Sequence, residues 1–504
     1  MVGDKMAISY NYIPSDIRVP LFYAELDNSM ANTAKAQKKS LLIAQHIGDT
    51  ATAGKPYLIS TSTQAKNLFG RGAPLTIMAE AYRNQDTAGE LWCLPMSVSG
   101  TAASGKITLA GTSIASGTIS LYVGSTKVAI PVASGAKDTE IAQAIIDAIT
   151  AHKDLPVQAS LDEAGEQKVV KVTAKQVGTY GNDIPLNLNL QGYAGGEEAV
   201  QGLSVEITAL SGGTGDIDYK KAFEAIKADT FYYIGIQSCD ATVLDACQDE
   251  MQDATGRWSY ARMQYGHVFS VKKDTAENLV KLGKARNDQH VSVFGCEAKH
   301  PEPAFVLAGA ITGAAAVCLS NDPARPLQTR ELVGIMAPAM EDKFGFNEQN
   351  TLLHNGIATL YDTAGTVMIQ RAITTYQTNK FGDADNSYLD VTTMFTLAEI
   401  ITTLKGVITS KYPRHKLASD GTNFGPGQAI VTPAIIKSEL IAQYKQLERK
   451  GLVENTNLFA KYLIVERNAD DPNRLDVLLP PDLVNQLRIF ALQAQFRLQY
   501  SENV

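Results

Sequence analysis

The sequence predicts a multidomain α/β and α+β protein, with a layered α/β core, an inserted β-rich domain, an α+β C-terminal domain and an extended arm at each end. Three observations support this fold class. After Asp216, helical and strand patterns alternate, which is typical of a mostly parallel, layered core. Between Ser99 and Ser211 the chain is rich in Gly, Ser, Thr and Val and carries short alternating runs, as small β-rich domains do. Both termini carry period-two apolar patterns without a local partner.

Composition and charge narrow the classes of function. The 504 residues are 45% hydrophobic and 19% charged, an ordinary globular mix that argues against wholesale disorder. The net charge of -8, without a long Lys/Arg run, predicts no binding to nucleic acid. The N-terminus lacks a signal-peptide layout, and no apolar stretch is expected to cross a bilayer, so we expect folding in a cytoplasm without membrane insertion. The five widely spaced cysteines indicate buried thiols in a reducing compartment.

Residues 28–98 and 212–380 are expected to form one discontinuous core, interrupted by the inserted domain at 99–211. The first core segment contains the strand-like runs SLLIAQ and ELWCLPMSV around the helical pattern PLTIMAEAYRNQ, which has Pro74 at its start. The second contains the helical patterns YKKAFEAIKA and VLDACQDEMQDA and the strands TFYYIGIQ, HVFSV and HVSVFG.

The inserted domain carries five strand-like runs, KITLAG, TISLYVG, TKVAIPV, QKVVKVTAKQ and LSVEITAL. One helix interrupts them. Asp138 is its predicted N-cap, and its apolar face contains Ile141, Ile145, Ala148 and Ile149.

Residues 381–484 are expected to form the C-terminal α+β domain. One predicted helix carries Leu397, Ile400, Ile401, Leu404 and Ile408 on a single face. A second begins with Thr432 as N-cap and Pro433 in its first turn, and ends at Gly451. We expect this second helix to bury three apolar residues, Ile436, Leu440 and Leu447.

The terminal arms, 1–27 and 485–504, are the most informative segments. In the first arm Ile8, Tyr10 and Tyr12 alternate with polar neighbours, and Pro14 and Pro20 break any regular element. In the second arm the run LRIFALQAQFRLQY is longer than a typical strand. It could close a sheet of its own chain or add to the sheet of another subunit; the similar character of both ends favours exchange. The C-terminal residues assigned to exchange are Ile489, Phe490, Leu492, Ala494, Phe496 and Leu498.

Two segments resemble catalytic or nucleotide-binding motifs. The run from Gly100 to Lys106 matches GxxxxGK, but Ile107 follows where a phosphate loop needs Ser or Thr and a helix. The run GTSIA around Ser113 resembles the nucleophile segment of subtilisin-type proteases, and Asp27 and His46 precede it in that family's order. The usual Pro is missing and His46 lies only 67 positions away (113 minus 46), so we interpret Ser113 as a turn residue.

No metal, cofactor or catalytic site is predicted. The seven histidines form no HExxH or HxH pair, and the spacing of Cys296 and His300 is interpreted as incidental. A glycan-binding inserted domain is a further alternative, but Tyr122, Tyr180 and Tyr193 are too scattered to form an aromatic platform.

Several segments, in order, resemble the contractile tail sheath proteins of Mu-like phages. The N-terminal one is IPSDIRVPLFYAELDNSMA, residues 13–31. The later ones are RAITTY (371–376), SYLDV (387–391), DGTNFGPG (420–427), VTP (431–433), GLVEN (451–455), VERN (465–468), NRLD (473–476) and FRLQ (496–499). Residues 99–211 resemble the family least, as expected for a variable inserted domain.

The resemblance implies a structural subunit, not an enzyme, with a core that is subtilisin-like by fold alone. Sheath subunits form six-membered rings stacked helically around a tail tube, exchange strands through their arms, and contract to drive the tube through the host envelope during genome ejection. The implied partners are other copies of the chain and the tube, baseplate and tail terminator proteins. The implied location is the virion tail, after assembly in the host bacterial cytoplasm.

Two finer expectations follow from this resemblance. The C-terminal domain would lie nearest the tube, so the basic cluster Lys411, Arg414 and Lys416 could contact it; a solvated helix end is the alternative. Pro480 and Pro481 are candidate hinges beside the C-terminal arm. A bacteriocin-like particle or injection system would use the same subunit, and a subtilisin-type hydrolase is the alternative of another class.

Overall fold

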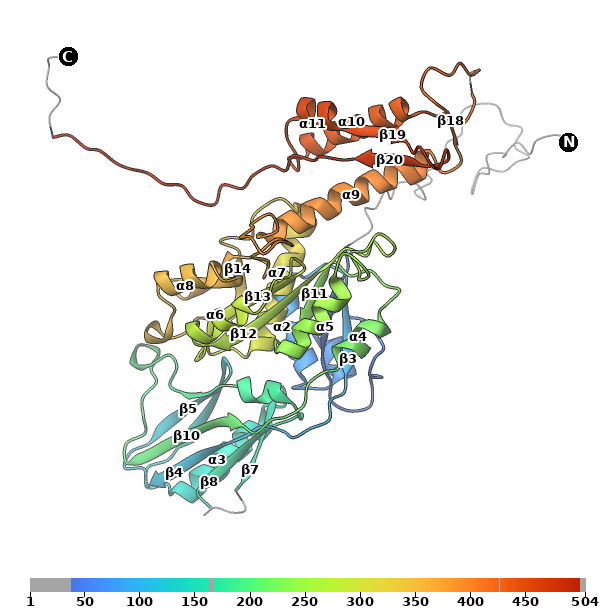
Figure 1. Cartoon of the computed structure of the whole chain (residues 1–504). Coiled ribbons are helices and arrows are strands. Elements are labelled where there is room, and N and C mark those ends of the chain that lie inside the picture. Colours follow the sequence, from blue (N-terminus) through green and yellow to red (C-terminus); the bar gives the residue numbers. More distant parts are fainter. Residues whose placement is uncertain (1–37, 163–166, 426, 499–504) are drawn as a thin grey trace, which may run out of the picture. The chain divides into compact units, whose positions relative to one another are not determined.

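The computed structural model describes residues 38–162, 167–425 and 427–498. Its largest feature is a nine-stranded sheet in the order β14–β16–β15–β13–β12–β11–β1–β3–β2 (Figure 1). The six strands from β15 to β3 are parallel, and β2, β14 and β16 are antiparallel to their neighbours. The strands are β1 (Ser40–Gln45), β2 (Tyr57–Leu58), β3 (Leu91–Met96), β11 (Tyr233–Ile236), β12 (His267–Asp274), β13 (Val291–Glu297), β14 (Glu331–Met336), β15 (Ile357–Thr363) and β16 (Thr366–Arg371).

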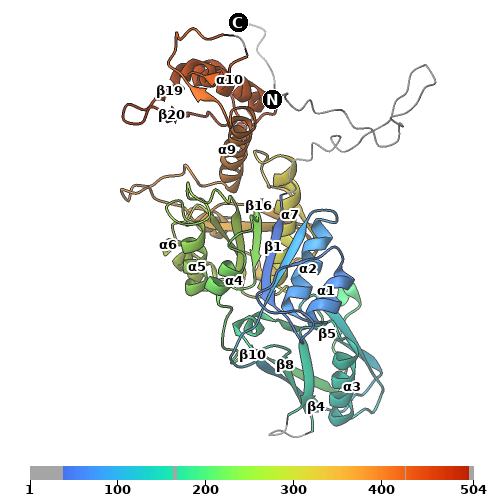
Figure 2. The same cartoon turned by 90° about the vertical axis from the view of Figure 1, so that its right-hand side faces the viewer.

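Helices cover both faces of this sheet, which explains why its central strands are apolar throughout. In β1, Leu42 and Ala44 belong to the hydrophobic cluster on one face, and Leu41 and Ile43 to the cluster on the other. Figure 2 shows α1 and α2 on one side of β1 and α4, α5 and α6 on the other. The helices are α1 (Ser62–Phe69), α2 (Pro74–Gln85), α4 (Tyr219–Ala225), α5 (Ala241–Met251), α6 (Ala276–Lys284), α7 (Ala304–Asn321) and α8 (Phe346–Leu353). The layered α/β core predicted from the alternating pattern is confirmed.

The expectation about membrane-spanning length was wrong. Among the described residues, α7 and α9 (Val391–Lys411) are each long and apolar enough to cross a bilayer. In α7 this composition has another cause, because 72% of the helix is buried and it packs against α2, β11 and β12. It is apolar on all sides because the core surrounds it.

The inserted segment forms two small sheets, β10–β4–β8–β7 and β6–β5–β9, with α3 packed beside them. All five predicted strands are present, and two short strands, β7 and β9, were not predicted. Helix α3 begins at Asp138, so the N-cap is Lys137 and the predicted position was one residue late. The elements are β4 (Ser104–Gly111), β5 (Gly117–Val123), β6 (Thr126–Val132), α3 (Asp138–Ala151), β7 (Val157–Leu161), β8 (Val169–Ala174), β9 (Leu186–Leu188) and β10 (Leu203–Ser211).

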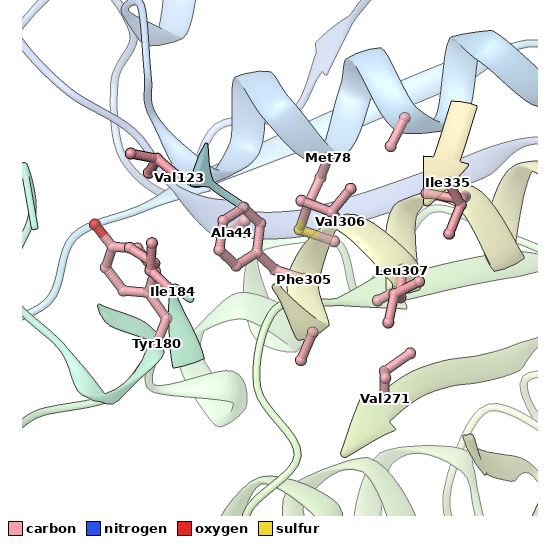
Figure 3. Close-up of a cluster of buried hydrophobic side chains, with 14 of the residues drawn as sticks. Ala44, Met78, Val123, Tyr180, Ile184, Val271, Phe305, Val306, Leu307 and Ile335 are labelled. Carbon is pink, nitrogen blue, oxygen red and sulfur yellow. The ribbon is translucent and has the colours of Figure 1, made fainter. Parts of the chain in front are cut away.

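One continuous hydrophobic cluster joins the inserted segment to the core. Figure 3 shows Tyr180 and Ile184 of the inserted segment beside Phe305 at the start of α7. The rings of Tyr180 and Phe305 meet edge to face, with centroids 5.7 Å apart. Because aromatic pairs of this geometry stabilise beyond their buried area, the contact fixes the inserted segment to the core.

The C-terminal part is α+β, as predicted. Thr432 caps α10 by accepting a hydrogen bond from the Ile435 N–H, Pro433 is its first residue, and Gly451 follows its end with a φ of 72°. Helix α10 buries Ile436, Leu440 and Leu447 as predicted. The prediction for α9 was partly wrong, because Ile401 is 38% exposed. The elements are α9, β17 (Lys416–Leu417), β18 (Ile430–Val431), α10 (Pro433–Arg449), α11 (Thr456–Tyr462), β19 (Ile464–Arg467) and β20 (Leu475–Leu478).

Candidate assembly surface

The two motif-like segments are parts of ordinary β structure. Lys106 lies within β4, where its Nζ is 2.6 Å from Asp162 Oδ2, so a strand follows the glycines where a phosphate loop would place a helix. Ser113 is buried; its hydroxyl donates to the Ala133 carbonyl and accepts from the Ala136 N–H. His46 lies 3.3 Å from the Met96 carbonyl, and Asp27 is outside the described residues. Ser113 therefore holds a turn, as interpreted.

The remaining candidates also have structural partners. Cys296 is buried in β13, and His300 Nδ1 accepts from the Glu302 N–H at 3.1 Å. Within the described ranges, no three His, Cys, Asp or Glu residues gather as a metal site would require. Of the three tyrosines considered for a glycan platform, Tyr122 and Tyr180 are buried and Tyr193 is exposed.

The place where a doubly wound sheet usually binds a ligand is occupied by protein. Ligands bind outside the carboxyl ends of the strands, where the strand order reverses. Here the order reverses between β1 and β11. Gln237 Nε2 donates to Gln45 Oε1, the Gln45 N–H donates to Gln237 Oε1, and Gln45 Nε2 donates to the Val177 carbonyl, each at 2.8 Å. Val177 belongs to the inserted segment, so this crevice serves as its attachment point.

A small cavity of about 290 Å³ lies beside the carboxyl ends of β11 and β12. Two of its charged groups are paired with each other: Lys272 Nζ is 3.1 Å from Asp240 Oδ1. The Ser238 hydroxyl donates to Asp216. This arrangement stabilises the junction with the inserted segment and presents no activated nucleophile.

The C-terminal arm is the most unusual surface of the described chain. From residue 489 to 498 it runs as extended chain, and Figure 1 shows it without a neighbouring element. Its large apolar side chains are solvent-exposed, the fraction reaching 84% at Phe496 and 97% at Leu498. Apolar side chains rarely gather in the open on soluble proteins, and such exposed groups commonly mark interaction surfaces. The exposed ones are Leu487, Ile489, Phe490, Leu492, Phe496 and Leu498.

The arm begins later than the sequence predicted. The Val484 N–H donates to the Leu452 carbonyl at 3.3 Å, and Gln486 Nε2 donates to Thr392 Oγ1 at 2.7 Å. Arg488 pairs with Asp390 at 2.9 Å. Residues 485–488 are therefore attached to the subunit, and the solvent-exposed apolar run starts at Ile489.

The two predicted hinge residues lie between two attached segments. Pro480 and Pro481 follow β20, and the backbone of the next residue, Asp482, is fixed by two hydrogen bonds. Its N–H donates to the Tyr444 hydroxyl at 3.0 Å, and its carbonyl accepts from the Glu454 N–H at 2.9 Å.

The hairpin of β19 and β20 has the properties of a strand acceptor. The two strands pair antiparallel over four residues and form a sheet of their own. Val465 and Leu475 pack against the C-terminal cluster, whereas Ile464, Val477 and Leu478 are between 43% and 62% exposed. A two-stranded sheet is marginal alone, and among the described residues no further strand pairs with either of its edges. Additional strands would therefore stabilise it.

The basic cluster after α9 is only partly available to a partner. Lys411 Nζ is 2.7 Å from Glu439 Oε1. Lys416 Nζ is 3.4 Å from Gln428 Oε1. Arg414 is exposed. The N-terminal arm residues Ile8, Tyr10 and Tyr12 lie outside the described residues.

Comparisons with known proteins identify the family. Residues 212–375 match the family described as phage tail sheath protein central domain, and residues 383–497 match phage tail sheath C-terminal domain. The chain is 37% identical over 499 residues to the Mu-like prophage FluMu tail sheath protein of Haemophilus influenzae, which covers 98% of this chain and 100% of that protein. The chain belongs to the phage tail sheath family. It is a structural subunit of a contractile tail sheath.

Solved structures of sheath proteins are also similar to this subunit. The sheath tail protein of Desulfitobacterium hafniense is 13% identical, with a TM-score of 0.49, over 93% of this chain and 97% of that one. The sheath tail protein Lin1278 of Listeria innocua is 12% identical, with a TM-score of 0.48, over 90% and 93%. The helical sheath of the anti-feeding prophage in its contracted state is 11% identical, with a TM-score of 0.43, over 95% and 99%.

Proposed function

We propose that this sheath subunit polymerises as six-membered rings stacked helically around a tail tube, and that contraction of the polymer drives the tube through the host envelope. The baseplate and tail terminator proteins would hold its two ends, and assembly would take place in the host bacterial cytoplasm before the sheath becomes part of the virion tail. The observation that supports this proposal is the exposed apolar arm at residues 489–498, which needs a partner.

The arm would add as a strand to the hairpin β19–β20 of a neighbouring subunit. Backbone pairing supplies affinity in this mode, and alternate side chains fit the acceptor. The hairpin offers unpaired edges and exposed apolar residues, and the arm offers an apolar face in extended chain. The arm at residues 1–27 would be exchanged in the same way. Neighbours would then stay linked while their bodies move, as a contracting polymer requires.

The alternating pattern of the arm allows a matched test. Leu492→Glu with Phe496→Glu places charges on the apolar side, whereas Gln493→Glu with Gln495→Glu places the same charges among the residues opposite. We expect the first pair to abolish polymerisation and the second to leave it nearly unchanged, as judged by negative-stain electron microscopy and sedimentation. A truncation after Arg488 should remain monomeric. Tubes formed by the truncated chain would contradict strand exchange.

The tube contact is a second part of this proposal, and Arg414 is its main residue. Lys411 and Lys416 already have partners in the subunit, so the exposed Arg414 guanidinium is best placed for acidic tube residues. Arg414→Glu should weaken co-assembly with the tube protein, while Lys450→Glu, an exposed change elsewhere in the same domain, should not. Equal effects of both substitutions would exclude a specific contact at Arg414.

We further propose that the subunit carries out no hydrolysis. Ser113 has both of its hydrogen-bonding capacities occupied by backbone groups. A fluorophosphonate probe should leave the protein unlabelled, and labelling at Ser113 would contradict this proposal.

A further inference from the structure

Helix α9 belongs to two hydrophobic clusters. Its first half contributes Val391 and Phe395 to the cluster of the large core, and its second half contributes Ile400 and Leu404 to the C-terminal cluster. The Phe395 ring stacks on Tyr233, the first residue of β11, with centroids 5.2 Å apart and planes at 17°. It also lies 6.1 Å from the ring of His267, the first residue of β12. Helix α9 therefore lies over the amino ends of the central strands.

The C-terminal arm is attached at the start of this helix. Asp390 occupies the N-cap position, but its side chain makes no capping hydrogen bond. The carboxylate instead accepts two hydrogen bonds from Arg371, at 3.1 and 3.0 Å, and one from Arg488 at 2.9 Å. The absence of a side-chain cap costs helix stability. The Asp390 carboxylate instead forms charge-assisted hydrogen bonds with the two guanidinium groups, which are strong interactions.

Neighbouring hydrogen bonds strengthen this attachment. Gln486 Nε2 donates to Thr392 in the first turn of α9 and to the carbonyl of Ala324, which follows α7. The Arg488 side chain is 14% exposed, whereas the next residue, Ile489, is 79% exposed. The change from attached to solvent-exposed chain thus takes place within one residue.

The first described residue, Lys38, also contacts this helix. Lys38, which precedes β1, places its Nζ 3.0 Å from Glu399 Oε2, and the two side chains are 12% and 8% exposed. The same Nζ lies 5.6 Å from the centroid of the Tyr232 ring. A buried ion pair of this kind is costly to break.

We infer that α9 is the common anchor of the C-terminal arm and of the chain segment that enters β1, with Lys38, Glu399, Asp390 and Arg488 as positioning residues. This inference rests on the proposed strand exchange. Asp390 and Glu399 are nine residues apart, about 14 Å along a helix. The two ion pairs lie on opposite sides of the central strands, at β16 and just before β1. Tension between neighbouring subunits would then be transmitted through helix α9. A fixed point of attachment also raises the effective concentration of an arm at its acceptor.

The test measures polymerisation of the full chain over a concentration series, by sedimentation and electron microscopy. Arg488→Gln and Lys38→Gln should each raise the critical concentration about tenfold, equivalent to about 1.4 kcal/mol per subunit. The variants Arg488→Lys and Lys38→Arg, which keep the charge, should recover most of this loss. Lys411→Gln breaks a more exposed ion pair on the same helix, 2.7 Å to Glu439, and should leave the critical concentration unchanged.

Two failures can be told apart. If the chain truncated after Arg488 polymerises normally, strand exchange itself is wrong. If the truncation stays monomeric while Arg488→Gln and Lys38→Gln, folded by circular dichroism, assemble at the wild-type concentration, strand exchange stands and the anchor is wrong. Should Arg488→Gln not fold, Gln486→Ala tests the same attachment without removing a charge, and its assembly at the wild-type concentration would overturn the inference.

Discussion

At the scale of single residues, burial has changed the pKa of His300, the histidine considered above because of its spacing from Cys296. His300 accepts a hydrogen bond from the Glu302 N–H, and Lys273 Nζ donates to the His300 carbonyl at 2.7 Å. Desolvation, and then the charge of Lys273, lower the pKa of His300 to about 3. Its ring therefore supports the fold in the neutral form.

This shift gives a pH dependence with a definite sign. A histidine with a folded pKa near 3 and an unfolded pKa near 6.5 binds a proton more readily in the unfolded chain. Its stabilising effect is complete above about pH 6.5 and is lost as the pH falls toward 3. His300→Asn retains an acceptor without the titration. We expect its unfolding free energy to fall less steeply between pH 6 and 4, by about 1.4 kcal/mol per pH unit relative to wild type.

Chemical denaturation across this pH range would measure the difference. Exposed His152→Asn is the control and should keep the wild-type slope. His267, whose pKa burial also lowers, remains in both proteins and cancels in the comparison. Parallel curves for wild type and His300→Asn would refute the assignment.

At the scale of elements, α7 and α2 approach so closely that only glycine fits between them. A Cβ placed on Gly309 would lie 2.5 Å from the Met78 carbonyl oxygen. Gly309→Ala should therefore destabilise the protein by about 1–3 kcal/mol, since backbone cannot move aside as a side chain can. Gly406→Ala in α9 meets nothing within 4 Å and should stabilise by up to about 1 kcal/mol, because alanine is the better helix former. Urea unfolding of both variants tests the sign; a stabilised Gly309→Ala would contradict this packing.

Most elements could be predicted because their patterns are local. The alternation in β4 and β5 and the cap at Thr432 each depend on residues close in sequence. The apolar pattern of the arm is of the same local kind. Two features could not be predicted: the contact of Gln45 with Val177 and the ion pair of Asp390 with Arg488. Their partners are 132 and 98 positions apart, and no local periodicity reports such a distance.

At the scale of the whole molecule, the inserted segment and the core share one hydrophobic cluster, so the segment is a structural part of the subunit. Its ends are close, because Thr101 and Thr214 exchange backbone hydrogen bonds at 3.2 and 3.1 Å. Replacing residues 102–213 by a short Gly-Ser linker is therefore geometrically mild. The deletion would nevertheless expose the Phe305 side chain to solvent and remove the hydrogen bond from Gln45 to the Val177 carbonyl. We expect the unfolding free energy to fall by about 3 kcal/mol or more.

Thermal and urea unfolding of this excised chain test the expectation. The control is truncation after Arg488, whose described part, residues 489–498, is exposed; it should change stability by less than about 0.5 kcal/mol. An excised chain as stable as the full subunit would show that the inserted segment is an independent appendage.

The exposed arm has a further consequence for the newly made subunit. In the strand exchange proposed above, each copy would present an exposed apolar arm and a two-stranded hairpin until it joins a neighbour, and this combination also favours aggregation. Subunits that meet at random would pair their strands in any register. Subunits added one at a time to the end of an ordered polymer would pair in a single register. Under this proposal, faithful growth would require that free subunits form no faster than the growing end of the polymer incorporates them. A seed that presents correctly oriented arms would then control the length and the order of the polymer kinetically.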